Sequence, residues 1–129
     1  VREEKLSLKQ AECIKLKDID TFAGSSIGER IKRAYAYGGV KREQPFVFEY
    51  DRQLVQGVID LYFIEDGQLV IVDYKTDRVL RGRAGEDELR RRYSIQLDYY
   101  AMALSQITGL KVKEKVIYSF ALGRSLTVE

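Results

Sequence analysis

The sequence predicts an α/β domain in which a mixed β-sheet is flanked by helices. Within residues 57–75, two runs rich in Val, Ile, Leu and aromatic residues meet at Asp66-Gly67, a dipeptide typical of a tight hairpin turn. Apolar residues recur at helical spacing across residues 87–108, and a further strand-like run follows at residues 113–122. The expected order of helix, three strands, helix and strand is that of an α/β domain.

The composition is that of an ordinary folded domain. The 129 residues, 45% of them hydrophobic and 33% charged, suffice for one buried core. The formal net charge is only +2, so a polyanion would have to be met by a local basic patch. No apolar run reaches membrane length and no signal peptide is visible, so we expect a cytoplasmic protein without membrane contact. The single cysteine, Cys13, excludes an internal disulfide and an iron–sulfur cluster.

The chain is expected to open with a charged lead-in or linker segment at residues 1–20, followed by the folded domain at residues 21–129. A helix should begin at Ser26, since Ser26-Ile-Gly-Glu29 has the spacing of a capping box. Gly38-Gly39 should end this helix. Its expected apolar face consists of Ile27, Ile31, Ala34 and Tyr35.

The first strand is expected at residues 40–50, near the edge of the sheet because it contains Pro45. From the strand pattern, Glu43 is expected to be an exposed or Arg-paired residue. After the hairpin turn, the run from Leu69 to Val72 is apolar on both faces, which indicates a strand in the middle of the sheet.

The long helix is expected from about Asp87 to Thr108, with Gly109 ending it. Gln96 and Tyr100 are four residues apart and therefore share one face. The strand at residues 113–122 should carry Val116, Tyr118, Phe120 and Leu122 on one face, and Leu126-Thr-Val should pair with it. The apolar stripe expected for the helix is Leu89, Tyr93, Leu97, Tyr100, Leu104 and Ile107.

Charged side chains follow the buried strand at the end of the hairpin. Asp73 and Lys75, two residues apart, project from one face, and Asp60 on the neighbouring strand can lie opposite them. Two carboxylates about 4 Å apart repel by roughly 1 to 4 kcal/mol, and a divalent cation turns that repulsion into attraction. Asp60, Asp73 and the backbone carbonyl of Tyr74 form an all-oxygen set that suits Mg²⁺ or Mn²⁺. With Lys75 holding a water or offsetting phosphate charge, the cluster suits metal-assisted phosphodiester hydrolysis, whereas a plain exposed ion pair is disfavoured by the apolar run before it.

These residues also carry a family resemblance. Asp60 followed by Asp73-Tyr74-Lys75 resembles the motif of the PD-(D/E)xK nuclease superfamily, and Gln96-Leu-Asp-Tyr-Tyr100 resembles the Q-x-x-x-Y motif of its RecB-like branch. Over residues 22–121 the sequence is similar to the C-terminal nuclease domain of the AddA component of bacterial AddAB helicase-nucleases. The wider matching segments are Arg42-Glu43-Gln44-Pro45-Phe46, Val55-Gln56-Gly57-Val58-Ile59-Asp60 and Val72-Asp73-Tyr74-Lys75-Thr76-Asp77.

The resemblance implies a restriction-endonuclease-like fold and a Mg²⁺-dependent, exonuclease-type deoxyribonuclease, in which Mn²⁺ can substitute. It further implies DNA as substrate, a helicase portion in the same chain, an AddB-type partner subunit, and a role in double-strand break repair and recombination. Metal ligands would be Asp60, Asp73 and the Tyr74 carbonyl. The resemblance also makes Glu43 a candidate metal ligand, as the alternative to an exposed or Arg-paired residue. The implied catalytic residues are Asp60, Asp73, Lys75, Gln96 and Tyr100.

The sequence departs from the family pattern at two points. Ile59 stands where the motif usually has proline, and the chain has no histidine, although RecB-like nucleases usually carry one on a helix ahead of the sheet. Because the chain also opens at Val1, we expect a fragment that begins after that helix. No G-x-x-x-x-G-K-[ST] loop is present, so this piece has no ATP site. The alternative is a nuclease-like scaffold that binds DNA or a partner subunit without cutting.

Arginines follow the motif along the chain. Those on the polar, glycine-containing stretch after the hairpin could lie on a mobile loop and hold backbone phosphates. The acidic residues 86–88 among them could instead mark a helix N-terminus. Asp77 is expected to be a turn or cap residue. The candidate DNA-binding residues are Arg78, Arg81, Arg83, Arg91 and Arg92.

Overall fold

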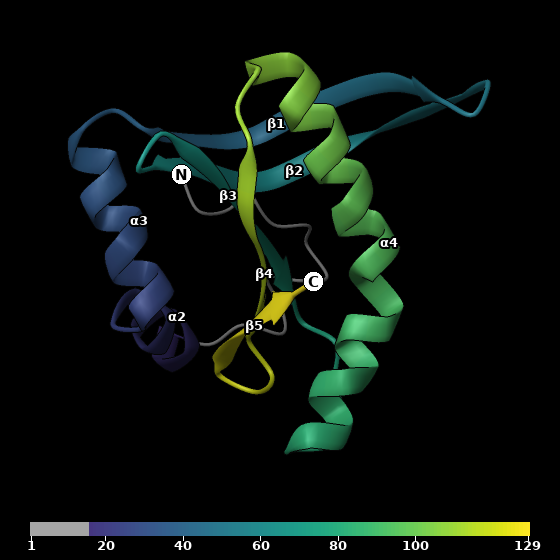
Figure 1. The fold of residues 1–129 in the computed structure, drawn as a ribbon. Helices are drawn as coiled ribbons and strands as arrows, with labels where there is room; N and C mark the ends of the chain where they lie inside the picture. The colour runs from purple at the N-terminus through teal and green to yellow at the C-terminus, as the bar shows by residue number, and fades with distance from the viewer. Residues whose placement is uncertain (1–15) are drawn as a thin grey trace.

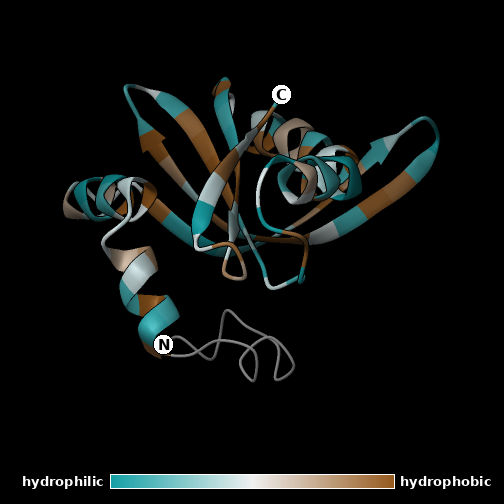
Figure 2. Ribbon diagram, turned by 90° about the horizontal axis from the view of Figure 1, so that it is seen from below, coloured by the Kyte–Doolittle hydropathy of each residue, from teal (hydrophilic) through white to brown (hydrophobic). Residues whose placement is uncertain are grey.

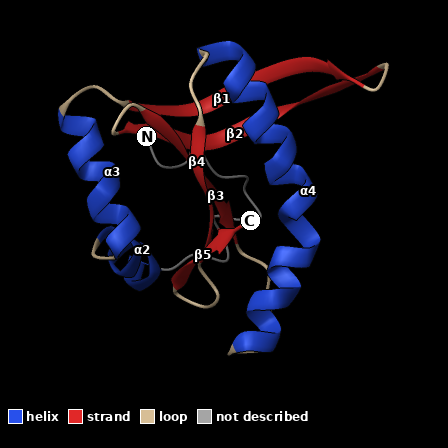
Figure 3. Ribbon diagram, viewed as in Figure 1, coloured by secondary structure: helices blue, strands red, loops and turns tan. Residues whose placement is uncertain are grey.

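The structure is a computed structural model, and it describes residues 16–129. Its sheet has five strands in the order β1-β2-β3-β4-β5, of which β3 and β4 are parallel and the other neighbours antiparallel. Helices α2 and α3 lie against one face and α4 against the other (Figures 1 and 3). The predicted mixed sheet flanked by helices is confirmed. The elements are α2 (Leu16–Ala23), α3 (Ser26–Ala36), β1 (Val40–Tyr50), β2 (Gln53–Glu65), β3 (Gln68–Lys75), α4 (Arg83–Thr108), β4 (Val112–Ser119) and β5 (Arg124–Val128).

Strand β3 is the centre of the molecule. All four residues from Leu69 to Val72 are fully buried, because both faces of this strand are covered. Leu69 and Ile71 face α4, whereas Val70 and Val72 face α3. Figure 2 shows apolar residues along the strands and a mixture of polar and apolar residues along the helices. Two apolar layers therefore fix the sheet between the helices.

The hairpin that joins β2 to β3 has the predicted turn. Asp66 and Gly67 have φ angles of 55° and 74°, so both occupy the left-handed region that this type of two-residue turn requires. Strand β1 covers the predicted residues and lies at the sheet edge, where Pro45 is tolerated. Strand β2 pairs with β3 only from Leu61 to Glu65, so the far half of the β1–β2 hairpin extends beyond the sheet (Figure 1).

The N-cap of helix α3 lies one residue earlier than predicted. Ser25 is the N-cap, and its side-chain oxygen accepts a hydrogen bond from the backbone N–H of Gly28 at 3.1 Å, so the capping role assigned to Ser26 was wrong. Tyr35 is 66% exposed, because it lies about 100° round the helix from buried Ala34. The helix ends at Ala36, and Gly38 follows with a φ of 73°, as expected.

Helix α4 begins at Arg83, four residues before the predicted start at Asp87. Gly82 takes the N-cap position with a positive φ, a start signal that the apolar pattern does not contain. The helix ends as predicted at Gly109, which is left-handed. Ile107 is 53% exposed and does not extend the buried stripe.

The last strand pair differs from the expectation, since β4 ends earlier than expected and β5 begins earlier, at Arg124. Strand β4 ends at Ser119 rather than at Leu122, because the Ser119 side chain accepts a hydrogen bond from the backbone N–H of Leu122 at 3.0 Å and starts a turn. The expected pairing of residues 126–128 is confirmed, since β5 runs antiparallel to β4. The expectation about Cys13 lies outside the described residues. No helix in the described range 16–129 is long and apolar enough to cross a membrane.

Candidate active site

The site forms where β2 separates from β3. Their pairing ends at Leu61 and Val72, so Asp60 and Asp73 are the next residues on the two strands. Asp73 follows Leu69 and Ile71 on the face covered by α4, since side chains alternate along a strand. The backbone N–H of Tyr74 donates a hydrogen bond to Asp60 Oδ2 at 2.8 Å. The hairpin thus brings the two predicted carboxylates together at one end of the buried strand.

Lys75 lies in the same cluster and is held from three sides. Its Nζ is 2.9 Å from Asp73 Oδ2 and 3.0 Å from Gln96 Oε1, and it lies 4.0 Å from the centre of the Tyr93 ring. Only 15% of the Lys75 side chain and 3% of the Asp73 side chain are exposed. This is not an exposed surface ion pair, because water is largely excluded from both charges.

The electrostatics of the cluster favour a cation. Burial, followed by the neighbouring charge of Asp73, raises the pKa of Asp60 to about 7, while the N–H of Tyr74 and the Lys75 ammonium act in the opposite direction. One lysine therefore does not fully compensate the buried carboxylate of Asp73 and the half-buried carboxylate of Asp60. An added divalent cation would compensate the remaining negative charge.

The residues present fit a hard metal ion. Asp73 Oδ2 is buried and makes no hydrogen bond in the described structure, although it is paired in charge with Lys75. The part of the chain that the structure describes contains no group of three or more His, Cys, Asp or Glu side chains that could hold a metal. Mg²⁺ does not require one, because it commonly binds through one or two carboxylates plus water and substrate phosphates.

Glu43 lies opposite Asp60 in the pairing of β1 with β2, since Arg42 pairs with Leu61 and Gln44 with Ile59. Its φ is 51°, in the left-handed region, which costs of order 1 to 3 kcal/mol for a residue with a side chain. Its carboxylate does not join the two aspartates in a three-residue cluster among residues 16–129. Its role as a metal ligand stays a prediction.

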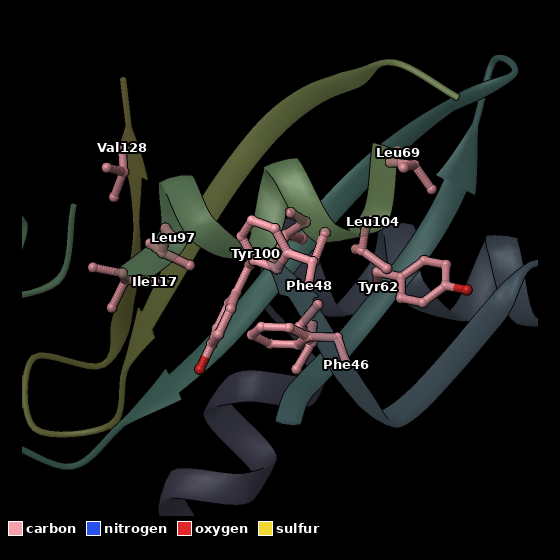
Figure 4. Close-up of a cluster of buried hydrophobic side chains, with 12 residues drawn as sticks. Phe46, Phe48, Tyr62, Leu69, Leu97, Tyr100, Leu104, Ile117 and Val128 are labelled. Atoms are coloured by element: carbon pink, nitrogen blue, oxygen red, sulfur yellow. The ribbon is translucent and has the colours of Figure 1, made fainter. Parts of the chain in front are cut away.

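Helix α4 contributes Gln96 and Tyr100 from one face, as expected from their spacing. Gln96 accepts the hydrogen bond from Lys75, and Tyr100 packs edge-on against Phe46 with ring centres 5.5 Å apart. Figure 4 shows Tyr100 between the helix and the Phe46 side of the sheet. Burial and the negative charges of Asp73 and Asp60 raise the pKa of Tyr100, so its hydroxyl stays protonated and can donate a hydrogen bond towards the carboxylates.

Two residues at the site were not recognised from the sequence. Asp77, expected to be a turn or cap residue, accepts hydrogen bonds from the Tyr93 hydroxyl at 2.6 Å and from Arg92 at 2.8 Å. Tyr93, expected only in the apolar stripe, presents its ring to Lys75. Burial and the bond to Asp77 raise the pKa of Tyr93 to about 12. The sequence signal that could have placed Tyr93 at the site was its spacing, since it precedes Gln96 by about one helical turn and therefore lies on the same side of the helix.

The predicted DNA-binding arginines have different surroundings. Arg78 and Arg81 line a hollow of about 330 Å³ that also includes Thr76, just after β3. Arg83 opens α4 instead of lying on the loop, with a side chain that is 93% exposed. Arg92 is already paired with Asp77 and Glu88. The fifth, Arg91, is exposed on α4.

Comparison with known proteins is consistent with this geometry. The curated relatives include three that each bear the name of an ATP-dependent helicase/nuclease subunit. The one from Thermoanaerobacter sp. is 39% identical over 141 residues, covering 98% of this chain and 11% of its own. The one from Lachnoclostridium phytofermentans is 33% identical over 174 residues, covering 100% of this chain and 12% of its own. The one from Acetivibrio thermocellus is 39% identical over 142 residues, covering 98% of this chain and 11% of its own. This chain thus spans about a tenth of the length of these relatives.

A family model provides the assignment. The model of the PD-(D/E)XK nuclease superfamily matches residues 15–126, a range that includes every residue of the cluster and the three helices that flank the sheet. The resemblance drawn from the motifs is confirmed, and the chain belongs to the PD-(D/E)XK nuclease superfamily.

Proposed function

We propose that this domain is a Mg²⁺-dependent deoxyribonuclease of exonuclease type. The observation that carries the proposal is the pair of the half-buried Asp60 and the buried Asp73 beside Lys75, with one Asp73 oxygen that makes no hydrogen bond in the described structure. Nucleases of this superfamily generally use divalent metals. Mn²⁺ would substitute for Mg²⁺, because both accept oxygen ligands.

The residues have distinct roles in this proposal. Asp60, Asp73 and the Tyr74 backbone carbonyl would hold the cation, which when bound supplies Lewis-acid stabilisation of charge on the scissile phosphate. The Lys75 ammonium would donate a hydrogen bond that orients the attacking water. Gln96 keeps Lys75 in place through the 3.0 Å contact. The Tyr100 hydroxyl would donate to a ligand or water beside the carboxylates.

The proposal extends to the surroundings of the domain. Arg78, Arg81, Arg83 and Arg91 would hold backbone phosphates, and Arg92 would do so only by giving up one of its carboxylate partners. The name of the relatives supports a helicase portion in a longer chain, in which ATP would be hydrolysed. An AddB-type partner subunit, the cytoplasm as location, and a role in double-strand break repair and recombination belong to the same proposal.

The proposal is tested with Asp73→Ala and Lys75→Ala in the full-length protein. Each variant should lose Mg²⁺-dependent DNA cleavage in a gel assay while keeping its circular dichroism spectrum. Asp98→Asn is the matched control, because Asp98 is half exposed and pairs with Lys115 at the helix surface, outside the carboxylate cluster. Cleavage retained by either test variant would contradict the assignment.

A second measurement separates a silent scaffold from a nuclease. Mn²⁺ should broaden the NMR signals of Asp60 and of residues 73–75 before those of other residues, since paramagnetic broadening reports proximity. DNA binding without any metal effect on these signals, together with absent cleavage by the wild type, would favour the scaffold.

A further inference from the structure

A groove lies between the β1–β2 hairpin and helix α4, next to the carboxylate cluster. Its volume is about 400 Å³. The hairpin contributes Phe46, Gln56 and Gly57 to its lining. The helix contributes Ile95, Gln96 and Tyr99. The groove is thus formed by two elements that are far apart in the sequence.

The groove is continuous with the proposed catalytic centre. Gln96 forms part of its wall and accepts a hydrogen bond from Lys75 Nζ at 3.0 Å. Tyr100, which faces Asp60 and Asp73, also lines it. One side chain therefore separates the groove from the Lys75 ammonium. In a nucleotide, one sugar separates the base from the phosphate. A strand whose phosphate lies beside Lys75 would place a neighbouring base at the groove.

The lining has the chemistry that a nucleobase needs. Tyr99 is half-buried, and Ile95 is 66% exposed, so both offer apolar surface to a ligand. A Cβ atom on Gly57 would lie 3.1 Å from the Phe46 ring, a tight contact, so glycine lets that ring lie close against β2 at this position. The side-chain amides of Gln56 and Gln96 add donors and acceptors. Base–aromatic stacking accepts every base, since each has a π face.

We propose that this groove is a nucleobase subsite, which takes the base of a nucleotide adjoining the scissile phosphate after that base has left its stack. The subsite rests on the proposed nuclease function. It assigns Ile95, Tyr99 and Gln56 to substrate binding, in addition to the residues of the metal cluster.

Ile95 is the best position for a test, because its exposed side chain contributes little to folding. Tyr99 is less suitable, since its ring also packs against the hairpin. Its ring centre lies 6.2 Å from that of Phe48 and 5.7 Å from that of Tyr50. Ile95→Glu places a carboxylate in the groove. Ile107→Glu is the matched control, because Ile107 is also exposed on α4 but does not line the groove.

The first readout does not require cleavage. Oligonucleotides that carry 2-aminopurine at successive positions are titrated with the full-length protein in EDTA. At least one position should show fluorescence quenching in the wild type and in Ile107→Glu, and Ile95→Glu should lose most of it. Equal quenching in all three proteins would overturn the subsite.

The second readout uses single-turnover cleavage of oligonucleotides that carry one abasic site. The wild type and Ile107→Glu should cut beside the abasic site at least about fivefold more slowly than beside a base, a factor at the weak end of base stacking. Ile95→Glu should lose this discrimination. Cleavage that ignores the abasic site in every protein would overturn the subsite and leave the nuclease function intact. An absence of cleavage combined with Ile95-dependent quenching would overturn the nuclease function and leave base binding in the groove intact.

Discussion

At the scale of single residues, the position of Lys75 is the main result. A lysine on a strand end has four rotatable bonds, and here Asp73, Gln96 and Tyr93 hold its ammonium from three directions. Such fixing matters because a catalytic group must keep its geometry within a fraction of an ångström. Asp77 extends the arrangement, since it orients the Tyr93 ring through the hydroxyl.

The Tyr93 ring should therefore affect cleavage more than its hydroxyl does. Tyr93→Leu removes the cation–π contact with Lys75, worth about 0.5 to 2 kcal/mol, so the single-turnover rate should fall roughly 2- to 30-fold. Tyr93→Phe keeps the ring and should keep most of the rate. Rates for both variants equal to that of the wild type would show that the ring does not position Lys75.

At the scale of elements, an ion-pair network joins α3 to the sheet. Arg30 of α3 donates to Glu65 Oε1 at 2.7 Å and to Glu65 Oε2 at 3.1 Å, and it also pairs with Glu114 on β4. Lys113 lies 2.8 Å from Glu65. The hydrogen bond from Arg30 lowers the pKa of Glu65 to about 2, with a smaller contribution from Lys113. The network therefore stabilises the fold in a pH-dependent way.

Glu65→Gln should lower the free energy of unfolding by about 1.5 to 3 kcal/mol at pH 7, the usual range for a hydrogen bond to a charged group. The pKa of Glu65 is depressed on folding, so its contribution is complete above the ordinary value near 4.5 and is lost as the pH falls towards 2. Urea unfolding at several pH values should show the difference between variant and wild type shrinking over that window. Glu29→Gln, in an exposed pair with Lys32, should change little at any pH.

The start of α4 depends on one glycine. A Cβ atom on Gly85 would lie 1.7 Å from the backbone oxygen of Leu80, so the helix and the preceding loop could not both keep their positions. Gly85→Ala should lower the free energy of unfolding by about 1 to 3 kcal/mol, the usual cost of overpacking. Gly24→Ala is the control, because its Cβ would meet its nearest atom at an ordinary 3.6 Å. Equal unfolding midpoints for the two variants would contradict this account.

At the scale of the whole molecule, stability should be uneven. Strand β3 is buried on both faces, whereas residues 47–55 of the β1–β2 hairpin extend beyond the third strand. The hairpin also carries exposed Val47 and Leu54 on its surface. Regions with few tertiary contacts open at lower free energy than the core. The groove of the proposed base subsite thus has one rigid wall, α4, and one wall that opens more readily.

Native-state hydrogen exchange should reveal this gradient. The amides of residues 69–72 should exchange most slowly, at rates set by global unfolding, and those of residues 47–55 should exchange faster than the rest of the sheet. Uniform protection of all the strands would show that the hairpin is as stable as the core.

Local signals predicted much of the fold. The Asp66-Gly67 turn, the end of α4 at Gly109 and the bounds of β1 were all correct, because turn and cap chemistry acts over a few residues. Helix starts were less accurate. Ser25 and Ser26 are equally good cap residues, and α4 opens with a turn whose only apolar residue is Ala84. In both cases the first turn is fixed by packing against the preceding segment.

The sequence by itself determined which side chains can share a site. The strand period of two places Asp73 and Lys75 on one face, the hairpin turn brings Asp60 beside them, and the helical period keeps Gln96 with Tyr100. Only the tertiary structure decided that the Tyr93 ring lies against Lys75 and that a groove opens beside Gln96. The physical reason is that the rotation of α4 over the sheet is set by the packing of its buried residues Leu97 and Leu104, which contact residues distant in the sequence and leave no short-range pattern.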